Sequence, residues 1–332
     1  MPSAELATLC VGPNPALQRV LSFPSLKLGE VNRAAALTSY CGGKGQGAAL
    51  AALRWAPEGR HAVAQFLGGD SGRFCEEQLQ AAGLETITQK VTGPTRICTT
   101  LLNQADGSNT ELIDPSDPVT AEEVAGLVDA ITTQLSDFAV ISLCGTQPPG
   151  SEALYERLAA ALLRPPPGPA SAQEPILLLD GFKAVDGVLH SSRLDVLKIN
   201  RDELIALTEQ PTVEEAATFL LRGSEARLTR PNAVIAVTDG PRPAMLFRQT
   251  EAWKLSVPEV PCLNPIGAGD VCTGVFAHQL AAGDDALEAF AWGLAAASAR
   301  VVKRDPTFDP IRVRELYAAV KKEPIETWNG TA

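Results

Sequence analysis

The clearest chemical signal in the sequence is the segment Asn264–Leu280, NPIGAGDVCTGVFAHQL. Gly267, Ala268 and Gly269 precede Asp270, and a helical pattern of apolar residues follows. Small residues let the backbone approach a ligand, and the free N–H groups of a helix's first turn point toward it. The pattern indicates an anion hole for a transferring phosphoryl group, with Asp270 placed to accept the proton of an attacking hydroxyl. An ordinary tight turn with Asp270 as a helix N-cap would use the same residues.

A second cluster of glycines, CGGKGQGAALAAL, covers Cys41–Leu53. Gly42, Gly43 and Gly47 offer backbone amides, and Lys44 could hold a phosphate as a point charge. The cluster is not a Walker A loop, because GxxxxGK[ST] is absent. A glycine-rich helix start with an exposed lysine is the simpler interpretation of this cluster taken alone.

The same cluster raises an NAD-linked oxidoreductase as an alternative, because Gly43-x-Gly45-x-x-Ala48 matches a loose dinucleotide-binding pattern. The residues before it make a poor strand, and no convincing ribose-binding acid follows about twenty residues later. The lack of a preceding strand and of a ribose-binding acid both argue against an NAD-linked oxidoreductase.

Polar residues also follow a candidate strand in KINRDEL, Lys198–Leu204. Asn200 and Glu203 could face a metal-bound water beside a polyphosphate. A helix start, with Asn200 as N-cap and Glu203 as the acid of a capping box, explains the same spacing more simply. Arg96, in GPTRI, could grip a phosphate with two hydrogen bonds or could be an ordinary exposed arginine.

Short apolar runs alternate with longer helical patterns along the chain. Runs that are apolar throughout are typical of strands buried on both faces. The alternation predicts an α/β fold with a doubly wound, mostly parallel, Rossmann-like sheet, and the length fits a single domain over residues 1–332. Strands are expected at Leu6–Val11, Ala62–Leu67, Ala139–Leu143, Ile176–Asp180, Val196–Ile199 and Ala233–Thr238, and helices at Gly72–Ala82, Ala121–Leu135, Glu152–Leu163, Glu214–Leu221, Val271–Ala282 and Ala286–Lys303.

Segments 14–40 and 93–113 depart from this alternation, and each contains β-rich sequence. The second carries ADGSN between two extended runs, which is a hairpin signal. We expect the two segments to pair into a small sheet outside the main one and to form a lid over a substrate cleft. The Pro- and Ala-rich stretch 164–175 is expected to be an exposed connection.

Composition excludes several classes of protein. Asp and Glu number 39 against 28 Lys and Arg, and a net charge of −11 argues against sequence-independent binding to nucleic acid or to an anionic membrane. Seven cysteines without a CxxC pair, together with three histidines, give no zinc-type spacing and indicate a reducing compartment. No secretory signal and no membrane span is recognisable, so a cytoplasmic protein is expected.

Taken in order, these motifs resemble the phosphofructokinase-B branch of the ribokinase-like superfamily, and within it the 1-phosphofructokinase and tagatose-6-phosphate kinase group. The similarity extends over nearly the whole chain, and eight motifs in the same order are far more specific than any one of them. They are GPNPAL around Asn14, KLGEVNR (27–33), GGKG (42–45), FLGGD (66–70), GPTRI (93–97), CGTQPPG (144–150), NRDE (200–203) and GAGD (267–270).

The resemblance implies a ribokinase-like fold with a β-sheet lid, and a kinase that transfers the γ-phosphoryl group of ATP, with Mg²⁺, to a hydroxyl of a sugar phosphate. Fructose 1-phosphate and tagatose 6-phosphate are examples of such an acceptor. Positioning and charge neutralisation would supply most of the rate. Exposed lid strands often pair between subunits in related proteins, so a homodimer through the lid is also expected.

The same resemblance assigns roles to individual positions. Asp270 would be the base, and Gly267, Ala268 and Gly269 would form the anion hole. Asn14, Gln18, Gly42, Gly43, Lys44, Gly47 and Arg96 would bind the sugar phosphate, with Lys44 and Arg96 on its phosphate, while Lys198, Asn200, Thr238, Asp239 and Gly240 would bind the nucleotide and Glu203 the metal.

Four positions depart from the family's pattern. Gln18 stands where an acid usually recognises sugar hydroxyls, and Gly47 stands where GGKGxN has asparagine. Pro265 replaces a threonine, and TDGPRPA lacks the second glycine of the nucleotide loop. These changes leave open another acceptor, such as a nucleoside or a sugar without phosphate, and a catalytically silent binding or regulatory protein on the kinase fold.

Overall fold

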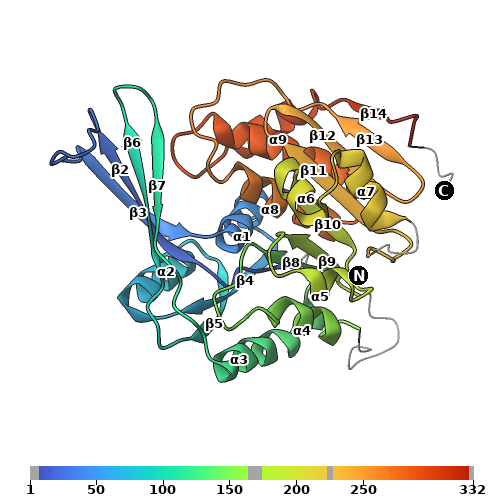
Figure 1. The fold of residues 1–332 in the computed structure, drawn as a ribbon, viewed down its shortest axis with the longest axis horizontal. Coiled ribbons are helices and arrows are strands. Elements are labelled where there is room, and N and C mark those ends of the chain that lie inside the picture. The colour runs from blue at the N-terminus through green and yellow to red at the C-terminus, as the bar shows by residue number, and fades with distance from the viewer. Residues whose placement is uncertain (1–6, 164–173, 223–226, 329–332) are drawn as a thin grey trace.

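The computed structural model describes residues 7–163, 174–222 and 227–328. A large sheet carries helices on both faces, and a small second sheet projects from one side of it (Figure 1). Within the described residues, no helix is both long enough and apolar enough to cross a bilayer. All seven cysteines are free thiols.

The large sheet has ten strands. Seven of them, from β5 to β11 in the order below, pair in parallel, and three antiparallel strands extend one edge. From edge to edge the strands are β14 (Lys322–Pro324), β13 (Ala252–Leu255), β12 (Arg242–Phe247), β11 (Val234–Asp239), β10 (Val196–Asn200), β9 (Ile176–Asp180), β8 (Val140–Cys144), β1 (Ala7–Val11), β4 (Arg60–Leu67) and β5 (Glu85–Lys90).

Alternate residues of the central strands face opposite layers of helices. Leu177 and Leu179 of β9 belong to the core beneath α3 to α7, whereas Leu178 belongs to the core beneath α8, α9 and α10. This burial on both faces is the reason for the uninterrupted apolar runs in the sequence. The helices are α1 (Lys44–Trp55), α2 (Gly69–Ala81), α3 (Ala121–Thr132), α4 (Leu154–Ala161), α5 (Asp186–Leu189), α6 (Arg201–Thr208), α7 (Val213–Leu221), α8 (Ala268–Ala281), α9 (Ala286–Val301) and α10 (Pro310–Tyr317), with a 3₁₀ turn at Leu135–Asp137.

The small sheet is built from the two segments that depart from the α/β alternation, as expected. Its order is β3 (Ala36–Gly42), β2 (Ala16–Phe23), β6 (Ile97–Asn103) and β7 (Asn109–Ile113). The ADGSN turn joins β6 to β7 in an antiparallel hairpin, and β2 pairs in parallel with β6. Only Gly43 separates the end of β3 from the start of α1, so the small sheet leads directly into the first helix of the main domain.

The structure confirms the α/β class and the six expected strands, with Leu6 lying outside the described residues. The sequence analysis did not find β5 or the edge strands β12, β13 and β14. β5, β12 and β13 mix exposed polar and buried residues, and β14 has no buried residue, so none of the four contains an apolar run of the expected kind. Most of the expected connection at 164–175 also lies outside the described residues.

Candidate active site

Helix α8 begins at a tight glycine turn. Gly267 is the N-cap, with a φ of 80° that disfavours any residue with a side chain, and Asp270 is the third residue of the first turn. The interpretation of Asp270 as an ordinary N-cap is therefore wrong, because its carboxylate is not required to cap the helix. The carboxyl lies at the positive end of α8 and opens into a cavity.

Burial, together with the negative charge of Asp180, raises the pKa of Asp270 to about 7. Lys198, Lys44 and Arg300 act in the opposite direction, because their positive charges favour the ionised carboxylate. A carboxyl with a pKa near neutral pH is well matched to accept and release a proton at that pH.

A buried carboxylate lies at the centre of the polar groups beneath this turn. Asp180, at the end of β9, is 1% exposed and accepts hydrogen bonds from Lys44 Nζ at 3.3 Å, Lys198 Nζ at 3.2 Å and Thr273 Oγ1 at 2.6 Å. Burial alone would raise the pKa of Asp180, but Lys198 and Lys44 outweigh it and hold that pKa below its usual range. Lys198 Nζ also donates to Gly269 O at 3.2 Å, which ties Asp180 to the first turn of α8.

Asn200 and Glu203 form the capping box that the simpler interpretation predicts. Asn200 Oδ1 accepts from the Glu203 N–H at 2.9 Å, and Glu203 Oε2 accepts from the Asn200 N–H at 3.2 Å. The other oxygen of Glu203 lies 3.4 Å from Lys44 Nζ. Glu203 therefore caps α6 and also contacts the lysine of the glycine cluster.

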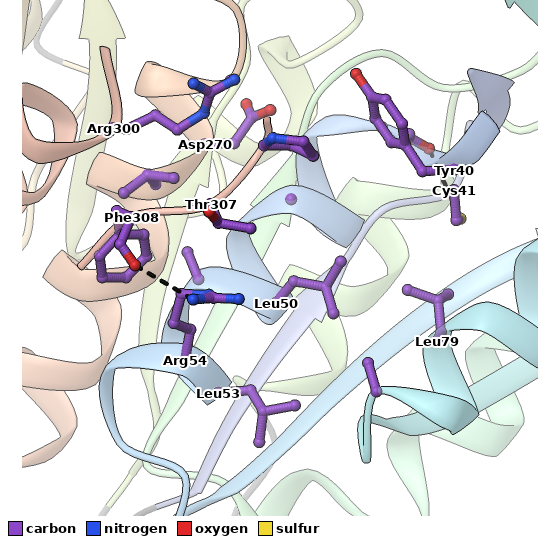
Figure 2. A pocket seen from close by; sticks show the side chains of 18 of the residues that line it. Tyr40, Cys41, Leu50, Leu53, Arg54, Leu79, Asp270, Arg300, Thr307 and Phe308 are labelled. Carbon is purple, nitrogen blue, oxygen red and sulfur yellow. Dashed lines mark hydrogen bonds between the residues drawn. The ribbon is translucent and has the colours of Figure 1, made fainter. Parts of the chain in front are cut away.

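Three cavities near the carboxyl ends of the strands hold most of the predicted site residues, but Ala268, Gly269 and Lys198 line none of the three. The first, of about 700 Å³, is shown in Figure 2, the second is about 210 Å³ and the third about 510 Å³. Gln18, Gly42, Gly43, Gly47, Gly267 and Asp270 line the first, Asn14, Lys44, Arg96 and Glu203 the second, and Asn200, Thr238, Asp239 and Gly240 the third.

The second cavity is held open by hydrogen bonds between distant segments. Arg96 Nη2 donates to Asn14 O at 3.1 Å, and its Nε lies 3.4 Å from Pro15 O. Asn14 Oδ1 accepts from Ser116 Oγ at 2.8 Å. These contacts orient the guanidinium of Arg96 in a cavity that Lys44 also lines.

Gly47 and Gln18, the two positions that depart from the resembled pattern on the acceptor side, have defined neighbours in the structure. A Cβ atom on Gly47 would lie 2.9 Å from both Cβ and Oδ2 of Asp270, so α1 approaches the carboxylate as closely as a glycine allows. Gln18 Nε2 donates to Thr100 Oγ1 at 2.8 Å, which links the neighbouring strands β2 and β6. Asp239 forms ion pairs with Arg242 at 2.6 Å and Arg201 at 3.5 Å at the rim of the third cavity.

Several residues of this centre were not found in the sequence. Asp180 could have been suspected, because an acid that ends an apolar run, ILLLD, lies at the carboxyl edge of a parallel sheet. Tyr40, Thr273 and Arg300 carry no comparable signal, because long-range packing alone brings them to the site.

Comparisons with known proteins agree with this arrangement. Phosphofructokinase-2 from Escherichia coli, in complex with substrates and products, has a TM-score of 0.81 at 22% identity, covering 95% of this chain and 99% of that one. A possible 1-phosphofructokinase and a ribokinase, both from Thermotoga maritima, have TM-scores of 0.77 and 0.73 at 17% and 21% identity. They cover 96% and 95% of this chain, and 100% and 99% of their own chains. At these identities the likeness establishes a ribokinase-like fold.

The family model gives the more specific result. Residues 16–312 match the model of the pfkB family carbohydrate kinases, a range that contains the glycine cluster, Asp180 and the GAGD turn. The match covers well over half of the chain. The protein therefore belongs to the pfkB family of carbohydrate kinases.

Proposed function

We propose that this chain transfers the γ-phosphoryl group of ATP to a hydroxyl of a sugar phosphate, with Asp270 as the base. The observation that carries the proposal is the Asp270 carboxyl, with its pKa raised to about 7, at the positive end of α8 and open to a cavity of about 700 Å³. The backbone amides of Gly267, Ala268 and Gly269 would stabilise the charge on the transferring group. The acceptor hydroxyl would lie against Asp270 in that cavity.

Arg96 is the stronger candidate for the phosphate already on the acceptor. Lys44 shares its ammonium with Asp180 and Glu203, so only part of its charge is directed at a ligand. The recorded hydrogen bonds of Arg96 are to the backbone oxygens of Asn14 and Pro15, which orient the guanidinium without neutralising it. A guanidinium held in this way can bind a phosphate with paired hydrogen bonds.

Replacing Arg96 with Met is expected to raise KM for the sugar phosphate by about 10- to 100-fold, because a hydrogen bond to a charged group contributes about 1.5–3 kcal/mol. Steady-state kinetics with the sugar phosphate varied would measure the change. Arg73→Met, which removes an exposed arginine paired with Asp70 on α2, is the matched control and should leave KM unaltered. An Arg96 variant with unchanged KM would place the acceptor's phosphate elsewhere.

The nucleotide would bind across the third cavity and the start of α8. Thr238 and Asp239 end β11, Gly240 follows them, and all three line this cavity with Asn200. Lys198 lies on the neighbouring strand β10. Within the described residues, no three His, Cys, Asp or Glu side chains are grouped to hold a metal ion. This set of donors fits a Mg²⁺ ion that arrives with the phosphates of ATP and keeps several waters, and Glu203, which lines the second cavity, would bind the ion through them.

A panel of acceptors tests the proposed function directly. The chain would be incubated with MgATP and phosphorylated ketoses and pentoses, each beside the same sugar without its phosphate and beside nucleosides, and ADP release would be measured. We expect turnover with a phosphorylated sugar and at least tenfold lower kcat/KM for its unphosphorylated partner. Turnover with a nucleoside or a neutral sugar alone would contradict the substrate class. Binding in calorimetry without any product would indicate a silent regulatory protein instead.

We also propose that two copies associate through the small sheet. Among the described residues, five of the eight large apolar side chains recorded as exposed lie in this sheet or in the β2–β3 connection: Leu28, Val31, Leu37, Leu112 and Ile113. Such a concentration of exposed apolar surface marks an interaction site.

Light scattering after size exclusion would test this association. The wild-type chain should elute as a dimer, and Ile113→Lys should convert it to monomer, because a charge would enter an apolar interface. Ile311→Lys is the matched control, since Ile311 on α10 is 65% exposed and Ile113 is 61% exposed. A wild-type monomer at micromolar concentration, or equal behaviour of the two variants, would refute the proposal.

A further inference from the structure

Arg300, in the last turn of α9, is a buried cation in the wall of the Asp270 cavity. The residue is 2% exposed, and the cavity that it lines is the one that Gly267 and Asp270 share. Figure 2 shows its guanidinium directed toward the side chain of Asp270. No sequence motif singled out this arginine, and the proposed chemistry does not use it.

The end of α9 holds the segment that leads into the anion-hole turn. Arg300 Nη1 donates to Lys303 O at 3.0 Å and lies 3.5 Å from Asn264 O. The backbone N–H groups of Leu263 and Asn264 both donate to Val301 O, at 2.7 and 3.1 Å. The guanidinium thus links the backbone just after α9, at Lys303, to the backbone just before the Gly267 turn, at Asn264.

The side chain also lies close to the turn itself. A Cβ atom placed on Gly267 would lie 3.9 Å from Arg300 Nε, so the guanidinium borders the space beside this glycine. Asn264 Oδ1 accepts from the Ile266 N–H at 3.0 Å, so the residues between Asn264 and Gly267 are fixed from both directions. A shift of Arg300 would therefore be transmitted to the backbone amides that open α8.

The charge of Arg300 acts on Asp270 from α9, whereas the two lysines lie on α1 and β10. The charged or titratable groups that interact with Asp270 are Asp180 on β9, Lys198 on β10, Lys44 on α1, Arg300 on α9, Tyr40 on β3 and Cys144 on β8. Both lysines also bind Asp180, so their charge is partly neutralised. The recorded hydrogen bonds of Arg300 go to backbone carbonyls, which leave its charge intact.

We propose that Arg300 is a positioning residue that holds the Gly267 turn at the start of α8 and places a fixed positive charge beside Asp270. The kinetic part of this inference rests on the proposed role of Asp270 as the base. An arginine near a helix C-terminus often only binds carbonyls at the helix end, and Lys303 O lies two residues beyond the end of α9. A capping arginine would affect stability but would leave the titration of Asp270 unaltered, and this difference can be measured.

The direct test is the titration of the Asp270 carboxyl in protein labelled with ¹³C at aspartate side chains, with Asp270→Asn used to assign the signal. Removing a nearby positive charge disfavours the ionised carboxylate, so its midpoint should rise in Arg300→Met, by roughly half a unit to one unit. Arg300→Lys keeps the charge and should restore the midpoint, while its single ammonium cannot span both carbonyls. An unchanged midpoint in Arg300→Met would overturn the proposal.

Kinetics separate the two parts of the role. In Arg300→Met the acid limb of kcat/KM should move to higher pH with the carboxyl midpoint, and kcat should fall by about tenfold or more as the anion-hole turn loosens. Arg300→Lys should recover the position of the acid limb but only part of kcat. Full recovery of kcat by lysine would contradict the positioning of the turn, although not the effect of the charge.

Arg193 provides a matched control for the loss of a buried arginine. It is 1% exposed, pairs with Asp195 at 2.6 Å and lines none of the three cavities. Arg193→Met should lower the thermal midpoint without moving the titration of Asp270. If the wild-type chain phosphorylates no acceptor, the proposed function fails, while the ¹³C titration still decides whether Arg300 sets the charge of Asp270.

Discussion

Asp270→Asn is expected to lower kcat/KM for the sugar phosphate by about 10²- to 10⁴-fold, the range usual for loss of a general base. Asparagine has nearly the same shape as aspartate and keeps the hydrogen-bonding reach of the side chain, but it cannot take the proton of the attacking hydroxyl. Most of the loss should fall on kcat, because the substitution leaves the proposed phosphate-binding residue Arg96 and the backbone amides of the Gly267 turn unchanged. Coupled measurement of ADP release would give both constants.

A helix-start aspartate away from the site provides the control. Asp285 caps α9, where its Oδ1 accepts from the Leu287 N–H at 2.9 Å, and it lines none of the three cavities. Asp285→Asn should leave turnover within twofold of the wild type, since asparagine is also a good N-cap. If Asp270→Asn retained wild-type turnover, Asp270 would have no part in the chemistry.

The pH dependence of the wild type follows from the same carboxyl. The base must be ionised, so kcat/KM should fall below pH 7 with a slope of one. Because the folded-state pKa is raised from 3.8 to about 7, the protonated form favours folding, and this stability is lost as pH rises between those values. Asp270→Asn has no such loss and should be more stable than the wild type above pH 7.

The second large effect concerns stability. Asp180→Ala is expected to lower the free energy of unfolding by about 3–5 kcal/mol, the usual cost of removing one partner of a buried ion pair. Lys198, which is 4% exposed, would lose its carboxylate partner, and Thr273 Oγ1 would lose the shorter of its two hydrogen bonds and keep only the one to Gly269 O at 3.0 Å. Urea unfolding followed by tryptophan fluorescence would measure the change.

Asp70→Ala is the appropriate comparison for Asp180→Ala. Asp70 pairs with Arg73 in a salt bridge whose aspartate side chain is 90% exposed, so its removal should cost less than about 1 kcal/mol. The pKa of Asp180 is held below 3.8, so its contribution is present above that pH and is lost as the pH falls further. A loss below 1 kcal/mol for Asp180→Ala at pH 7 would show that the lysines find other partners.

The fold could be predicted further than the site. Buried strands such as Ile176–Asp180 consist almost entirely of apolar residues, and the hairpin turn at 105–109 is formed by neighbouring residues, so both could be predicted from the sequence. The GAGD turn and the glycine cluster could be located because glycine is favoured where the backbone is left-handed, as at Gly267, or where it closely approaches another group, as at Gly47.

The partners of those turns could not be predicted, because tertiary contacts alone create them. Arg300 lies 30 residues after Asp270 on a different helix, and a regular apolar helix gives no indication of which residue faces the cavity. Similarly, Lys44 forms ion pairs with Asp180 and Glu203. These pairs exist only because three separate elements meet at one edge of the sheet. The sequence therefore locates the glycine turns of the candidate site, whereas the side chains that contact these turns depend on the tertiary structure.

The contact between Gly47 and Asp270 limits how this kinase can be re-engineered. The GGKGxN motif that the sequence resembles has asparagine at the place of Gly47, and Gly47→Asn would be the simplest way to add a polar side chain there. A Cβ atom at position 47 would lie only 2.9 Å from Cβ and Oδ2 of Asp270, so the new side chain on α1 would overlap the side chain of Asp270. The substitution would therefore displace the carboxyl group of Asp270, the proposed base, unless α1 or α8 shifted to make room for the new side chain.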